Sequence, residues 1–135
     1  MTFLDTNVLV YAVDVRDARK RQIAKAIIMS ARNSQEYVIS SQVLNEFSNV
    51  AIGKLKKTQQ ETKGFVELFM DINSVAVRPE WTVRAIEIMG QYNLQFYDSL
   101  LLASAQAVGC DRFLTEDLND GQVYCGVRAV NPFTA

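Results

Sequence analysis

The sequence contains no histidine. A Ser-His-Asp or Cys-His nucleophile, a two-histidine phosphodiesterase and a histidine-ligated zinc hydrolase all need an imidazole, so each of these mechanisms is excluded. If the chain is a hydrolase, its main remaining route is a set of carboxylates that hold a hard metal cation.

Cysteine is scarce, and Cys110 and Cys125 do not form a C-x-x-C pair. Without a secretory signal we expect reduced structural thiols, and neither a disulfide nor a zinc site. The opening residues include Asp5 and Asp14 where a signal peptide would be basic and then apolar, and no apolar run reaches the roughly 18 residues of a transmembrane helix. We therefore expect a soluble, cytoplasmic protein without membrane contact.

The chain is short and its charge is uneven. Its 135 residues, 49% of them hydrophobic, suit one domain over residues 1–135. Residues 1–63 hold ten Lys and Arg against six Asp and Glu, whereas residues 64–135 hold four against nine. A basic half can attract phosphate and an acidic cluster can attract metal. The alternative is that the basic residues of 16–25 and 54–57 form solvated helix faces.

Strand-like and helix-like segments alternate along the chain. Short β-rich runs predict strands at residues 2–4, 37–39, 74–77, 112–115 and 127–130. Apolar stripes and capping residues predict helices at about 18–32, 41–53, 58–70, 79–91 and 97–108, and a first helix capped by Thr6 and Asn7. This alternation predicts an α/β fold whose parallel sheet is covered on both faces. The ligand site of such a fold lies beyond the carboxyl ends of the strands.

Several acidic residues fall where such a site is expected. Asp5 and Asp117 follow predicted strand ends. Glu46 lies at the inward edge of its helix, since Val43 and Val50 occupy i−3 and i+4 and no Lys or Arg is at helical spacing.

Asp98 resembles Glu46 in its setting, because Leu94, Leu101 and Leu102 share its helix face. Each acid, taken singly, has an ordinary structural interpretation as a helix cap, a partly buried ion pair, an Asx turn or a loop acid. The four acids together favour a site for a metal cation.

Four short motifs carry a family resemblance. They are Asp5-Thr6-Asn7-Val8-Leu9, Ser41-Gln42-Val43-Leu44-Asn45-Glu46-Phe47, Tyr97-Asp98-Ser99 and Leu114-Thr115-Glu116-Asp117. In this order and over this length, the chain resembles a PIN domain, and among PIN domains it resembles the VapC toxins of toxin-antitoxin pairs. The resemblance implies a three-layer α/β/α sandwich with a five-stranded parallel sheet of order 3-2-1-4-5. It also implies Mg²⁺- or Mn²⁺-dependent endonucleolytic cleavage of RNA, a cognate antitoxin protein as partner, and a homodimer.

The resemblance also assigns roles to particular residues. The family's catalytic, metal-binding acids match Asp5, Glu46, Asp98 and Asp117. Asn7 and Thr115 match the polar residues that support these carboxylates. The loop that supplies the fourth acid leaves alternatives, because Glu116 or Asp120 could replace or supplement Asp117.

Two other functions are weighed against the nuclease. A phosphatase of the haloacid dehalogenase type also places an aspartate after its first strand, but it needs a second aspartate two residues later, where this chain has Asn7. A non-catalytic binding module with the PIN fold is the stronger alternative, since fold does not guarantee function. Loss of one or more acids would indicate such a module, and all four acids are present.

Overall fold

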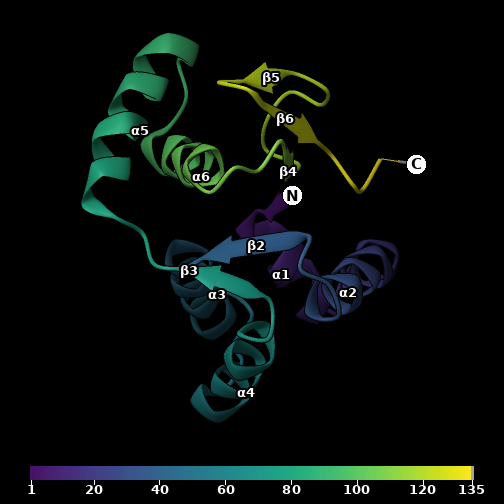
Figure 1. Ribbon diagram of the computed structural model, residues 1–135. Coiled ribbons are helices and arrows are strands. Elements are labelled where there is room, and N and C mark those ends of the chain that lie inside the picture. The colour runs from purple at the N-terminus through teal and green to yellow at the C-terminus, as the bar shows by residue number, and fades with distance from the viewer. Residues whose placement is uncertain (135) are drawn as a thin grey trace.

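A computed structural model describes residues 1–134 as a sheet flanked by helices (Figure 1). The sheet order is β3-β2-β1-β4-β6-β5. Its strands are β1 (Thr2–Leu4), β2 (Tyr37–Ser40), β3 (Asn73–Val75), β4 (Arg112–Leu114), β5 (Val123–Tyr124) and β6 (Val127–Val130). The first four strands and β6 are parallel, which confirms the expected α/β fold and the 3-2-1-4-5 order of the five predicted strands.

The one strand that the sequence did not predict is β5, which pairs antiparallel with β6 at the sheet edge. Cys125 and Gly126, which join the two strands, have φ values of 44° and 82°. Positive φ at both central residues is typical of the two-residue type I′ hairpin. A two-residue strand is too short to show an alternating pattern, which is why the sequence suggested a loop followed directly by the last strand.

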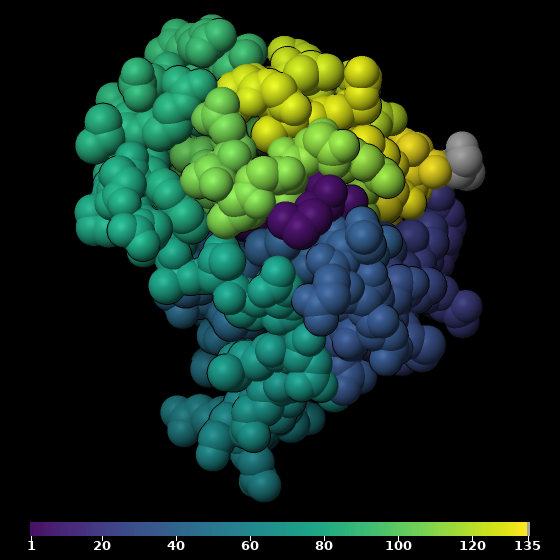
Figure 2. All heavy atoms as spheres, in the orientation of Figure 1, coloured from purple at the N-terminus to yellow at the C-terminus, as the bar shows by residue number. Residues whose placement is uncertain are grey.

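Within the described residues, six helices cover the sheet. They are α1 (Thr6–Val13), α2 (Ala18–Arg32), α3 (Ser41–Gly53), α4 (Gln59–Phe69), α5 (Pro79–Tyr92) and α6 (Phe96–Ala107). Figure 1 shows α5 and α6 on one side of the strands and α1 and α2 on the other. In the space-filling view of Figure 2, the first residues, in purple, lie between the segments around β2 and β4. Within residues 1–134, no helix is both long and apolar enough to cross a membrane.

The helix ends follow local capping chemistry. Asp5 is the N-cap of α1 and accepts a hydrogen bond from the Thr6 backbone N–H, so the prediction that Thr6 and Asn7 cap this helix was wrong. Thr58 and Glu61 form a reciprocal capping box at α4.

The centre of the molecule is apolar. Helix α6 is buried from Ser99 to Ala105, as its nearly continuous Leu and Ala content predicted. It packs against α5 and against strands β2, β4 and β6, and its first turn carries Asp98.

Candidate active site

A cleft of about 370 Å³ lies beyond the carboxyl ends of β1 and β4. Asp5, Glu46, Asp98 and Asp117 all contribute to its lining. They come from the end of β1, from α3, from the first turn of α6 and from the loop after β4. The structure thus brings together four side chains that are far apart in the sequence.

Asp5 is the most deeply placed of these acids, with a relative exposure of 4%. One carboxylate oxygen, Oδ1, accepts from the Thr6 backbone N–H at 2.6 Å, and the other, Oδ2, accepts from the Thr115 hydroxyl at 2.6 Å. Burial raises the pKa of Asp5 to about 7, and the charges of Asp117 and Asp98 act in the same direction. The side chain is therefore fixed in place while its charge lacks a cation.

Asp117 is connected to Asp5 through two polar residues. The Asn7 amide nitrogen donates to Asp5 Oδ2 at 3.4 Å and to Asp117 Oδ2 at 3.2 Å. The Asp117 backbone N–H donates to the Thr115 hydroxyl oxygen at 3.0 Å. Asn7 thus contacts both carboxylates, whereas Thr115 contacts the Asp5 carboxylate and the Asp117 backbone; the supporting role of the two residues stays a prediction.

Glu46 approaches the cleft from α3. Its Oε1 accepts from the Thr6 hydroxyl at 2.7 Å and from the Gln42 amide at 3.4 Å. Neither donor is charged, so the carboxylate is oriented without being neutralised.

Asp98 is half-buried in the first turn of α6. Burial raises its pKa above the ordinary value, and the charges of Asp117 and Glu46 act in the same direction. Burial is the larger cause, and the like charges of the neighbouring carboxylates add to it.

The two alternative acids of the loop have different positions. Glu116 lines the cleft, but its Oε2 pairs with Lys20 Nζ at 2.9 Å and its Oε1 accepts from the Tyr11 hydroxyl. Asp120 is not among the residues that line the cleft, and its Oδ1 accepts from the Asn131 backbone N–H at 2.9 Å. The geometry therefore favours Asp117 as the fourth acid, although its role as a ligand stays a prediction.

Several residues in the cleft or bonded to its lining were not predicted as site residues from the sequence. Thr6 holds Glu46, while Tyr11 and Lys20 hold Glu116. Tyr11 lies one helical turn after Asn7, so the i+4 spacing on α1 was the available signal. Arg16 also lines the cleft, whereas its place in a basic run left open whether it attracts phosphate or lies on a solvated helix face.

The donor set fits a hard divalent cation. Carboxylate and amide oxygens are the ligands that Mg²⁺ and Mn²⁺ prefer, and Asn7 Oδ1 is buried without a hydrogen-bond partner among the described residues. Within residues 1–134, no group of three or more acidic or cysteine side chains is arranged to hold a metal ion by itself. Mg²⁺ is usually bound by only one or two carboxylates, with waters and substrate phosphate completing its shell.

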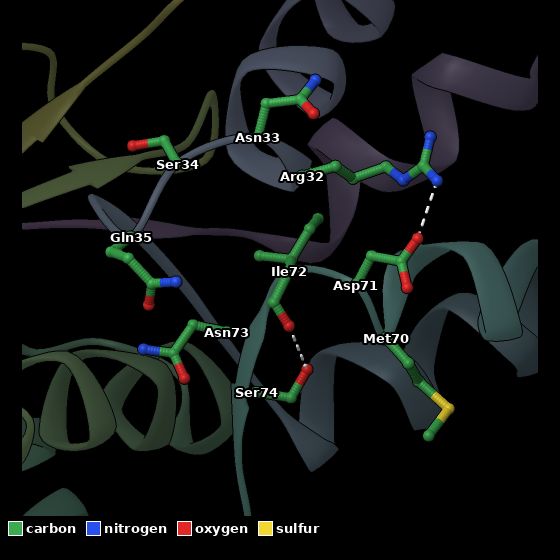
Figure 3. A pocket seen from close by; sticks show the side chains of 9 residues that line it. All are labelled: Arg32, Asn33, Ser34, Gln35, Met70, Asp71, Ile72, Asn73 and Ser74. Atoms are coloured by element: carbon green, nitrogen blue, oxygen red, sulfur yellow. Dashed lines mark hydrogen bonds and ion pairs between the residues drawn. The ribbon is translucent and has the colours of Figure 1, made fainter.

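A larger hollow, of about 580 Å³, lies at the opposite edge of the sheet, before β2 and β3 (Figure 3). Its one acid, Asp71, is paired with Arg32 at 2.7 Å, and Ser74 donates to the Ile72 carbonyl at 2.8 Å. Because this acid is ion-paired, the hollow lacks the uncompensated carboxylates of the acidic cleft.

Fold and cleft together define an α/β protein with carboxylates gathered at the carboxyl edge of a parallel sheet. The model of the PIN domain family matches residues 2–122, so the chain belongs to the PIN domain family. PIN domains generally bind divalent metal ions. A comparison with curated proteins found no match.

Solved structures with the same fold include several VapC toxins. VapC20 of Mycobacterium tuberculosis, described as a toxin that cleaves the sarcin-ricin loop, is 16% identical, with a TM-score of 0.71 over 87% of this chain and 90% of that one. A toxin-antitoxin complex from Klebsiella pneumoniae is 20% identical, with a TM-score of 0.71 over 98% of each chain. DNA-bound VapBC from Salmonella typhimurium is 18% identical, with a TM-score of 0.68 over 95% of each chain. At these identities the likeness establishes the fold alone.

Proposed function

We propose that this protein is a Mg²⁺- or Mn²⁺-dependent endoribonuclease and the toxin of a toxin-antitoxin pair. The observation that carries the proposal is the gathering of Asp5, Glu46, Asp98 and Asp117 in one cleft, where none of the four forms an ion pair with a Lys or Arg of residues 1–134. Similar folds occur in a toxin that cleaves the sarcin-ricin loop and in toxin-antitoxin complexes, which supports RNA as the substrate and an antitoxin as the partner.

Each acid has a task in this proposal. Asp5 and Asp98 would bind the metal ion, because burial raises the pKa of both carboxyls and a cation would relieve this cost. Asp117 and Glu46, whose positions at the cleft are set by Asn7 and Thr6, would bind it through water or directly.

The bound ion would supply a water of lowered pKa and neutralise negative charge on the phosphate. The chain itself orients the groups around that chemistry. Thr115 and Asn7 donate to Asp5 and so direct its remaining acceptor capacity into the cleft. Glu46 and Asp117, which are less deeply buried than Asp5, are the groups available to accept a proton from an attacking water.

An RNA cleavage assay tests the proposal directly. Purified protein is incubated with a mixed RNA pool and Mg²⁺ or Mn²⁺, with EDTA and Asp5→Ala as controls. We expect endonucleolytic fragments only with wild-type protein and metal. Equal behaviour of wild type and Asp5→Ala would contradict the catalytic assignment and favour a non-catalytic PIN-fold binding module.

The proposed assembly is tested separately. We expect a homodimer by light scattering, and inhibition of cleavage by a small protein encoded beside this chain. A monomer that cleaves RNA and is inhibited by no such neighbour would contradict the toxin-antitoxin assignment while leaving the nuclease assignment intact.

A further inference from the structure

The acidic cleft has a basic end. Besides the four acids, its lining includes Arg16 and Lys54. These two residues also line an adjoining hollow of about 110 Å³, together with Lys57. The cleft therefore changes from negative to positive charge along its length.

Two helices set the direction of this change. On α3 and its C-cap, Glu46, Val50 and Lys54 lie at i, i+4 and i+8, and all three line the cleft. On α1 and its C-cap, Asn7 and Asp14 are two turns apart and also line it. At about 1.5 Å per residue, the basic end is roughly 12 Å from the acidic end.

Arg16 is held in a fixed orientation. Its Nε and Nη2 donate to the two carboxylate oxygens of Asp14 at 2.9 and 2.8 Å, and its backbone N–H donates to Asp14 Oδ1 at 3.0 Å. Asp14 is itself buried, with a relative exposure of 6%. The Arg16 side chain is 61% exposed, so the other edge of the guanidinium faces solvent with free donors. A guanidinium group oriented in this way can donate hydrogen bonds to a phosphate group.

Lys54 supplies the second positive charge. Within residues 1–134, no carboxylate lies within ion-pair distance of it. Because three cations at this end face a single carboxylate, Asp14, a net positive field remains after the Asp14–Arg16 pair is formed.

We propose that Arg16 and Lys54 form a phosphate-binding subsite for the RNA backbone, which receives a phosphate that flanks the one cleaved at the acids. This inference rests on the proposed ribonuclease function. It sets the line along which the RNA backbone lies in the cleft. The reacting phosphate is at Asp5, and a flanking phosphate is two helical turns away. Asp14 is a positioning residue, because it acts only by orienting Arg16.

The test is the binding of a fluorescently labelled, mixed-sequence single-stranded RNA, measured by anisotropy in EDTA over a series of salt concentrations. Arg16→Gln and Lys54→Gln are compared with Arg78→Gln and Lys63→Gln, which remove the same charges outside the cleft. Each cleft variant should weaken binding by roughly tenfold and lower the steepness of its salt dependence, because one phosphate contact is lost. The two outer variants should bind as wild type does.

Lys54→Gln keeps the test decisive if Arg16→Gln fails to fold, because Lys54 has no partner to leave unpaired within residues 1–134. Equal binding by Lys54→Gln and Lys63→Gln would overturn the subsite. If wild type cleaves RNA and both cleft variants keep its affinity and KM, the subsite fails and the nuclease stands. If the cleft variants lose affinity and wild type cleaves nothing with Mg²⁺ or Mn²⁺, the nuclease fails and the subsite stands.

Discussion

The two hollows at opposite edges of the sheet differ in how their charges are balanced. The larger one, at the amino edge, holds Asp71 in a partly exposed ion pair with Arg32. The smaller one, at the carboxyl edge, holds Asp5 and Asp98 with raised pKa values because burial and neighbouring acids disfavour their charged forms. Uncompensated charge, and not volume, therefore marks the candidate site.

The topology explains why the two edges differ. In a parallel sheet the chain leaves every strand at the same edge, so loops and helix starts from β1 and β4 converge there. At the other edge, the segments before β2 and β3 connect helices to strands, and Asp71 there is ion-paired with Arg32.

The largest expected effect is on catalysis. Asp5→Asn should lower RNA cleavage by about 1,000-fold or more, because the metal ion supplies several kcal/mol of charge stabilisation. Asp71→Asn, the matched change at the amino edge, should cleave as wild type does. Single-turnover rates at saturating metal measure both, and similar losses in the two variants would remove the distinction between the edges.

A smaller loss is expected from the hydroxyl that supports Asp5. Thr115→Val keeps the shape of the side chain and removes the 2.6 Å hydrogen bond to Asp5 Oδ2. We expect about a 10- to 100-fold loss of metal affinity, typical of groups that orient a metal ligand. Ser74→Ala removes a hydroxyl at the amino edge and is the control. Metal titration by calorimetry would contradict the prediction if Thr115→Val bound Mn²⁺ as tightly as Ser74→Ala.

Metal binding should also stabilise the fold. At 100 times its Kd, an ion that binds only the folded state adds about 2.7 kcal/mol, which raises the Tm by roughly 5–15 °C in a chain of this size. When Mg²⁺ or Mn²⁺ replaces EDTA, the melting temperature of Asp71→Asn should rise as much as that of wild type. Asp5→Asn should show little or none, and a full rise in Asp5→Asn would place the binding site elsewhere.

The smallest effect concerns Asp14 at the basic end of the cleft. Hydrogen bonds from Arg16 lower the pKa of Asp14 to about 2, from the 3.8 of an unperturbed aspartate. A lowered acid pKa stabilises the folded state above about pH 4, and this contribution is lost as the pH falls towards 2. Because the Arg16 side chain is exposed, we expect only about 1 kcal/mol.

Urea unfolding of wild type and Asp14→Asn between pH 2 and pH 6 measures this contribution. The difference in unfolding free energy should shrink as the pH falls. A constant difference across that range would contradict the link between Asp14 and Arg16.

Much of the fold could be predicted from local patterns in the sequence. Helix α2 spans Ala18–Arg32, as its apolar stripe predicted, and β6 spans Val127–Val130. The prediction of the α1 cap was wrong, because the N-cap is Asp5. A side chain that faces a site can also cap a helix. The short strand β5 was not predicted, because two residues are too few to show the alternating pattern of a strand.

Less of the candidate site could be predicted from the sequence. The motifs named its acids, but they did not show that Lys20 and Tyr11 hold Glu116 or that Asp14 orients Arg16. Contacts between α1, α2 and the loop after β4 depend on how helices pack against the sheet, which no local pattern records.

The sequence by itself determined the alternation of strands and helices, the absence of imidazole chemistry and the placement of acids at strand ends, because these depend on residue type and spacing. Only the tertiary structure decided that Asp5 is buried between Thr6 and Thr115 and that Asp98 faces other carboxylates. It also decided that the cleft continues to Lys54. These features depend on strand register and helix packing between distant segments, and burial and repulsion exist only once those segments meet.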